Sequence, residues 1–370
     1  MPRGARWALL LAGAALYALV LAQAGIGRLL EQIAGARWTV PVAVGIYGVV
    51  YIFNAAAWHQ VLRAEPRHPP FLHTLRLTIS GFSINFITPF LAAGGEPYRV
   101  LSLGPWLDRQ RAVGAVLIFA LLHALSSIIL WLSALALAFI LMEWTVLHVT
   151  VLVLATFAVL GIGTVLIALH RHGLLIRLVR ILEKIPLLNR LGALLAKRRP
   201  ALIEIDEHIT HFYRNHRRRF LIALVFETIA RAVAVFELVV IARGVSLHLT
   251  YAQALCMSGL AALAINLMFF IPFELGWKEA SLLGIFRMLG LSGEIGVYTS
   301  VVSRLRELIW IGLGVGMAWF GSGPKPALGK RKPEASEREI AELEIVEPGI
   351  ESRKSEGGAA EGPEDGSGKT

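Results

Sequence analysis

Residues 112–142 read AVGAVLIFALLHALSSIILWLSALALAFILM and contain no charged side chain. A helix of about 20 apolar residues crosses the hydrocarbon of a bilayer, so this stretch can cross one with tilt to spare. A helix that is apolar on all faces must be surrounded either by protein or by lipid. The stretch predicts a membrane-spanning helix.

Comparable uncharged stretches lie between Arg6 and Arg28, between Arg37 and Arg63, and between Glu143 and Arg171. Charged residues make up only 17% of the chain and hydrophobic residues 56%, whereas soluble domains carry about 25% charged residues. We therefore expect an all-α polytopic membrane protein rather than a soluble enzyme. The first stretch exceeds the roughly 7–15 residues of a signal-peptide core, so we expect it to be retained as a span.

The apolar pattern predicts six spans, and its basic flanks predict their orientation. The spans are Trp7–Ile26, Trp38–Leu62, Ala112–Met142, Val146–His170, Phe220–Ala242 and Ile295–Phe320. Arg3 and Arg6 place the N-terminus in the cytoplasm by the positive-inside rule. Two further apolar pieces, Leu77–Gly95 and Leu247–Phe273, conflict with this orientation if they cross the bilayer. We predict that they are re-entrant helical hairpins that enter from opposite faces.

This arrangement gives a transmembrane domain of residues 1–320, with inverted halves at about 1–142 and 146–320. The linker 171–219 carries a net charge of +8 and is predicted to be cytoplasmic. Its apolar residues at 174–182 fit either a helix in the headgroup plane or a solvated connector. Residues 321–370 are rich in Gly, Pro, Glu, Ser and Lys, which predicts a disordered cytoplasmic tail.

The two predicted hairpins share a sequence signature. The first reads SINFITPFLAAGGEPYR at 83–99 and the second AINLMFFIPFELGWKEA at 264–280. The corresponding residues are Asn85 and Asn266, Pro89 and Pro272, and Gly95 and Gly276, followed by Glu96 with Arg99 or by Lys278 with Glu279. Proline breaks a helix and glycine permits a reversal, and broken helices at membrane depth are tolerated where they line a wet cavity. The pattern predicts a polar site where the tips meet, although Asn, Pro and Gly could equally serve only to cap and turn the chain.

These motifs resemble the lysylphosphatidylglycerol synthase transmembrane region, a flippase-like family. The resemblance covers about residues 5–320 and rests on Asn85, Pro89, Gly94-Gly95-Glu96 and Arg99, and on Pro272, Gly276, Lys278 and Glu279. One departure is Phe273-Glu274, where the family has glycines. Either Glu274 is an additional carboxylate at the site, or this tip is less flexible than in the family. The resemblance implies lipid translocation or lipid export without the soluble synthase domain, so synthase chemistry is not expected.

Charged residues also lie inside two of the predicted spans: Glu227, Arg231, Glu237, Arg304, Arg306 and Glu307. One such residue at a helix centre costs about 2.5–3.5 kcal/mol on insertion scales, so these side chains must pair or face a hydrated path. Their spacing predicts pairs between Glu227 and Arg231 and between Arg304 and Glu307. The pairs could be structural, or the arginines could bind an anionic headgroup through their bidentate fork.

We therefore predict a transporter or flippase for an anionic phospholipid, glycolipid or polyprenyl-linked lipid in the prokaryotic cytoplasmic membrane. The predicted substrate-binding residues are Asn85, Glu96, Arg99, Arg231, Asn266, Glu274, Lys278, Glu279, Arg304 and Arg306. The helix-breaking residues are Pro89, Gly94, Gly95, Pro272 and Gly276, and the candidates for proton coupling are Glu227, Glu237, Glu307 and His123, although a lone histidine more often has a packing role.

No cofactor, metal or nucleic acid is expected, and the single cysteine, Cys256, excludes an intrachain disulfide. Two alternatives remain open. The chain could be a membrane-embedded transferase acting on a lipid-linked sugar, with Glu96 or Glu279 as the base. It could also be a non-catalytic partner of a glycosyltransferase or synthase.

Overall fold

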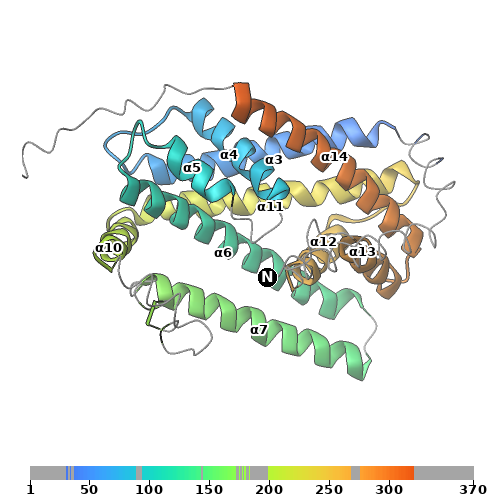
Figure 1. The fold of residues 1–370 in the computed structure, drawn as a ribbon. Helices are drawn as coiled ribbons and strands as arrows, with labels where there is room; N and C mark the ends of the chain where they lie inside the picture. The colour runs from blue at the N-terminus through green and yellow to red at the C-terminus, as the bar shows by residue number, and fades with distance from the viewer. Residues whose placement is uncertain are drawn as a thin grey trace, which may run out of the picture. The chain divides into compact units, whose positions relative to one another are not determined.

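The computed structural model describes residues 31, 34, 37–88, 94–142, 145–171, 175, 177, 179–180, 183, 199–267 and 276–320. Regular structure in this part of the chain is entirely α-helical (Figure 1). The helices are α3 (Thr39–Leu62), α4 (Phe71–Ile87), α5 (Gly95–Ser102), α6 (Arg109–Leu141), α7 (Val146–Arg171), α10 (Arg199–Asn215), α11 (Arg217–Gly244), α12 (Tyr251–Leu267), α13 (Trp277–Met288) and α14 (Gly293–Phe320).

Five of the six predicted spans fall in the described residues, and all five are helices. This confirms an all-α membrane protein. Three segments are both long and apolar enough to cross a bilayer: α3, α6 and residues 146–167 of α7. Helices α11 and α14 have 28 residues each, a length that also suffices, but they carry the buried charges of the predicted site. The predicted span Trp7–Ile26, most of the linker 171–198 and the tail 321–370 lie outside the described residues.

Two helices pack against each other across each predicted break, α4 with α5 and α12 with α13, although α13 begins after the predicted hairpin Leu247–Phe273. The breaks fall where the proline and glycine residues predicted them, since α4 ends at Ile87 and α5 begins at Gly95. In the second hairpin, Gly276 has a φ of 73°, a left-handed conformation that favours glycine, and α13 follows directly. The tips, with Pro89, Pro272 and Glu274, lie outside the described residues.

Helices α3–α6 and α11–α14 pack in matching patterns. Helix α3 lies along α11, and in Figure 1 the two run in opposite directions. Helix α4 packs on α14 as α12 packs on α6, and α3 packs on α4 as α11 packs on α12. If α3, α4, α5 and α6 are exchanged in that order with α11, α12, α13 and α14, each of these packing pairs becomes a pair that is also observed. Two related halves that are inverted relative to each other would pack in this way. Among the described helices, α7 and α10 have no counterpart in this exchange.

Helix α10 was not predicted, since the surface helix or connector expected in the linker concerns residues 174–182 and α10 begins at Arg199. Its apolar residues Ile205, Ile209 and Phe212 recur on one face and pack with Leu107 and Ala112 at the start of α6. A polar contact adds to this packing, because Glu65 accepts from His208 of α10 at 3.2 Å and pairs with Arg111 of α6 at 3.5 Å. Part of the basic linker is therefore an integral part of the helical bundle.

Candidate functional site

The first hairpin is joined across its break by Asn85 of α4. Its Oδ1 accepts from the backbone N–H of Gly95 at 2.7 Å, and its Nδ2 donates to Glu96 at 3.0 Å. Glu96 in turn accepts from Arg99 through both carboxylate oxygens at 3.1 Å. A Cβ on Gly95 would collide with the carbonyl oxygen of Gly81, so the close approach of the two helices requires glycine there. The structure thus brings together four of the residues predicted from the motif.

Arg99 is buried, with only 2% of its side chain exposed. Its guanidinium carbon lies 4.7–5.6 Å from the ring centroids of Phe82, Phe119 and Trp58, which is the geometry of cation–π contact. A Cβ on Gly81 would collide with Arg99 Nε, so no space is left on that side. In this conformation Glu96, 38% exposed, is the accessible member of the pair.

A second polar group lies between α3, α6 and α11. Glu227 is fully buried and accepts from His123 Nδ1 at 3.0 Å. With its amide turned so that Nδ2 faces the carboxylate, Asn54 donates to both Glu227 oxygens at 3.1 and 3.3 Å. The predicted pairing of Glu227 with Arg231 is wrong, because Arg231 points to α6 instead. There it donates to Ser126 Oγ at 2.7 Å and to the carbonyl oxygen of His123 at 2.9 Å.

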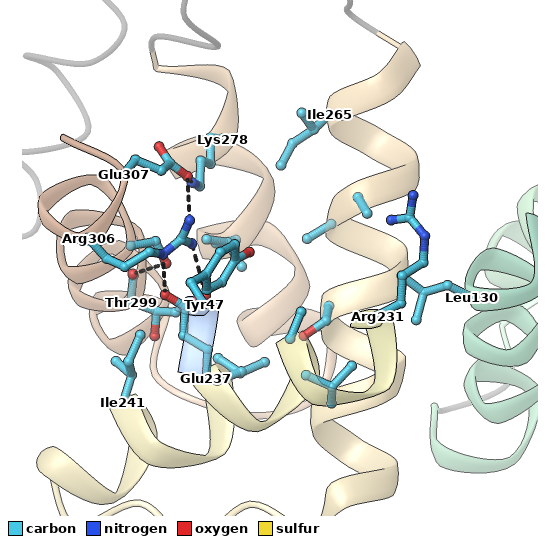
Figure 2. A pocket seen from close by; sticks show the side chains of 18 of the residues that line it. Tyr47, Leu130, Arg231, Glu237, Ile241, Ile265, Lys278, Thr299, Arg306 and Glu307 are labelled. Carbon is cyan, nitrogen blue, oxygen red and sulfur yellow. Dashed lines mark hydrogen bonds and ion pairs between the residues drawn. The ribbon is translucent and has the colours of Figure 1, made fainter. Parts of the chain in front are cut away.

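A cavity of about 300 Å³ lies among α11, α12, α13 and α14, and α3 and α6 contribute Tyr47 and Leu130 (Figure 2). Its charged wall consists of Arg231, Glu237, Lys278, Arg306 and Glu307. The remaining lining is mostly apolar or small and includes Val235, Leu238, Ile241, Ala261, Ile265 and Leu282. The cavity therefore combines a charged side with an apolar side.

Two ion pairs form the charged side of this cavity. Arg306 donates two parallel hydrogen bonds of 2.9 Å to Glu237, and its guanidinium lies 3.3 Å from the centroid of the Tyr47 ring. Lys278 Nζ lies 2.5 Å from Glu307 Oε1, which also faces Arg306 at 3.7 Å. Figure 2 shows the tips of Lys278 and Glu307 meeting, with the Arg306 side chain pointing toward them.

Glu279 of α13 and Arg304 of α14 form a further ion pair. Arg304 Nε lies 2.6 Å from Glu279 Oε1, and Ser300 donates to the same oxygen at 2.8 Å. Glu279 is fully buried. The predicted pair between Arg304 and Glu307 is therefore wrong, because each residue has its ion-pair partner on α13.

The two asparagines of the signature differ in their contacts. Whereas Asn85 joins the two helices of its hairpin, Asn266 lines the cavity, and its bond to a described residue stays within its own helix, to the carbonyl oxygen of Ala262 at 2.8 Å. Gly94 precedes α5, and a Cβ there would lie 2.6 Å from the Thr88 side chain. The halves thus share a backbone plan but use their polar side chains differently.

One face of α3 connects these groups, and it was missed in the sequence. Tyr47 contacts Arg306, Tyr51 contacts Phe82 and Trp310, Asn54 reaches Glu227, and Trp58 lies beside Arg99. The spacing of these four residues places them on a single helix face. That polar and aromatic stripe within an apolar span was the available signal.

No curated protein and no solved structure matches the chain. A family model does match, over residues 6–316, and it describes the lysylphosphatidylglycerol synthase TM region. The match covers both hairpins, the buried polar groups and the cavity. The chain therefore belongs to the lysylphosphatidylglycerol synthase TM region family, a family of flippase-like membrane proteins.

Proposed function

We propose that the protein moves an anionic lipid across the membrane and that the cavity beside Lys278 and Arg306 receives the headgroup. The observation that carries this proposal is the composition of the cavity wall. Among the described lining residues, three cations, Arg231, Lys278 and Arg306, stand against two carboxylates, Glu237 and Glu307, which leaves one positive charge in excess there. A buried excess charge is costly unless a counter-ion compensates it.

Arg231 is the strongest candidate ligand for that counter-ion. Among the described residues, its hydrogen bonds go to a hydroxyl and a backbone carbonyl, neither of which carries a charge. Arginine binds phosphate in a bidentate manner, and a headgroup phosphate would supply the missing negative charge. Lys278, on the same cavity, would add a second contact.

The size of the cavity favours a headgroup rather than a whole lipid. About 300 Å³ is at the low end of the range for small-molecule pockets, so acyl or isoprenoid chains would remain in the bilayer. The apolar side, with Ile265 and Leu282, would contact the first methylenes.

The transferase alternative requires a carboxylate that is free to accept a proton from substrate. Glu279 is fully buried, and its oxygens accept from Arg304 and Ser300. Glu96 is engaged by Asn85 and Arg99. These contacts favour positioning roles for both carboxylates and support transport over transfer.

We further propose that the end of the bundle that carries α10 faces the cytoplasm. Helix α10 lies at this end together with the N-terminal ends of α6 and α11, as Figure 1 shows. The basic residues there are Arg63, Arg67, Arg109, Arg111, Arg199, Arg214, Arg217, Arg218 and Arg219. The positive-inside rule favours this orientation in a prokaryotic inner membrane.

Reconstitution tests the proposed transport. Purified protein in liposomes with fluorescent phosphatidylglycerol should expose inner-leaflet lipid to external dithionite. It should act more slowly on fluorescent phosphatidylcholine, which has no net charge. The Arg231→Ala and Lys278→Ala variants should slow exchange about tenfold or more, since a hydrogen bond to a charged group contributes about 1.5–3 kcal/mol.

Arg243→Ala is the matched control, because Arg243 lies exposed at the end of α11, outside the cavity lining. Its exchange rate should equal that of the unaltered protein. Equal rates for all three variants would refute the headgroup site, and no exchange above empty liposomes by the unaltered protein would refute transport.

A further inference from the structure

Glu307 is the carboxylate that forms an ion pair with Lys278, the lysine of the cavity wall. Its Oε1 lies 2.5 Å from Lys278 Nζ and 3.7 Å from Arg306. Any anion that takes Lys278 as a ligand must therefore compete with Glu307 for the same ammonium group. Binding of a headgroup and the charge of Glu307 are coupled by this shared partner.

The two carboxylates of the cavity differ in how completely they are bonded. Glu237 uses both oxygens in parallel hydrogen bonds to Arg306. Glu307 uses Oε1, while its Oε2 is buried and has no hydrogen-bond partner among the described residues. A proton can bind Oε2 without breaking any hydrogen bond in that part of the chain, whereas protonating Glu237 would break one with Arg306.

An anion in the cavity would change the balance of charge around Glu307. It would draw Lys278 away and bring a second negative charge close to the carboxylate. Both effects favour the protonated form of a carboxylic acid, because the opposite charge recedes and a like charge approaches. A proton on Glu307 would leave Lys278 free for the headgroup.

From this competition we infer that Glu307 takes up a proton together with the anionic headgroup, so that the protein is a proton-coupled lipid transporter. This inference rests on the transport function proposed above. The proton binds Oε2 when the headgroup binds Lys278, and it leaves when the headgroup leaves and Lys278 returns to Oε1. The energy source is then the proton gradient.

Among the described residues, the groups that interact electrostatically with Glu307 come from three other helices and from α14 itself. They are Tyr47 and Tyr51 of α3, Glu237 of α11, Lys278 of α13, and Arg304 and Arg306 of α14, while Arg231 lines the same cavity but bonds to α6. Helix α4 also packs on α14, but its Arg76 lies at Met317, near the end of α14. Arg304 has its own carboxylate, Glu279. Arg306 is held by Glu237 through two hydrogen bonds, so Lys278 is the neighbouring cation that an anion can draw away from Glu307.

Proteoliposomes with an imposed pH gradient test the coupling. A gradient of about one pH unit supplies about a tenfold driving force for one proton. It should accelerate the movement of fluorescent phosphatidylglycerol by the unaltered protein, and a pH dye inside the vesicles should report proton entry only when this lipid is present. Glu307→Gln should lose the response of lipid movement to the gradient, whatever rate of exchange it retains, while Glu204→Gln, an exposed position on α10, should keep the response.

The outcomes separate the two proposals. Lipid exchange by the unaltered protein without any response to the gradient would overturn the coupling and leave transport standing. No exchange at all would overturn transport itself. A Glu307→Gln protein that still responds to the gradient would remove Glu307 from the coupling. If that variant fails to fold, lipid-dependent proton entry in the unaltered protein decides the coupling alone.

Discussion

Arg306 of α14 and Glu237 of α11 are joined by two parallel hydrogen bonds of 2.9 Å, and more than nine-tenths of each side chain is buried. The Tyr47 ring of α3 lies against the same guanidinium. Three helices that are distant in sequence thus meet at one ion pair on the cavity wall. A buried bidentate pair of this kind is costly to break from one side only.

Replacing one member of this pair should therefore destabilise the protein more than replacing both. Arg306→Met leaves the Glu237 carboxylate buried without its partner and should cost about 3–5 kcal/mol. The double variant Arg306→Met with Glu237→Met leaves no unpaired charge and should recover part of that loss. Unfolding of the detergent-solubilised protein by denaturant measures both, and a double variant less stable than the single one would contradict the argument.

Gly81→Ala should disturb the environment of Arg99. The new Cβ would collide with Arg99 Nε, and the aromatic rings of Trp58, Phe82 and Phe119 restrict the side chain from moving away. Overpacking of this kind costs about 1–3 kcal/mol. Gly45→Ala on α3 is the control, because no atom lies within 4 Å of the position that its new methyl group would take, and it should leave the thermal midpoint equal or slightly higher. Equal midpoints for both variants would show that Arg99 has room to shift.

His123→Ala should lower stability because it leaves a fully buried carboxylate with Asn54 as its remaining hydrogen-bond donor. An unsatisfied buried group costs about 1–3 kcal/mol, and more when it is charged. Adding Glu227→Gln removes the charge and should restore part of the loss. A double variant with no recovery, measured by the same denaturant titration, would mean that His123 acts through packing with Phe82 rather than through Glu227.

His208→Ala should loosen α10 from the bundle. The His208 ring bonds Glu65 at 3.2 Å, and its Cδ2 lies 2.5 Å from where a Cβ would stand on Gly114, so it lies directly against α6. Loss of this hydrogen bond should lower the free energy of local opening of α10 by about 1 kcal/mol. Amide hydrogen exchange in residues 199–215 should then become about fivefold faster. His211→Ala on the exposed side of α10 is the control and should leave exchange in these residues unchanged. Similar exchange in both variants would show that apolar packing alone holds α10.

The amino-acid sequence predicted the partners of buried charges poorly. A pair three or four residues apart on one helix contributes only about 0.2–0.5 kcal/mol, less than the cost of leaving a facing buried group unsatisfied. Glu227 therefore bonds His123 and Asn54, and Glu307 bonds Lys278 rather than Arg304. By contrast, the local contact between Glu96 and Arg99 was predictable because both lie on the first two turns of α5.

What the sequence determined by itself is local. Long uncharged stretches specify helices that need a bilayer, and proline and glycine specify where the hairpins break, since both effects act within a few residues. The tertiary structure alone decided that Tyr47, Asn54 and Trp58 face the buried charges, that α10 joins the bundle, and that a cavity opens beside Lys278 and Arg306. These depend on how the helices are rotated and packed against one another, which no single segment specifies.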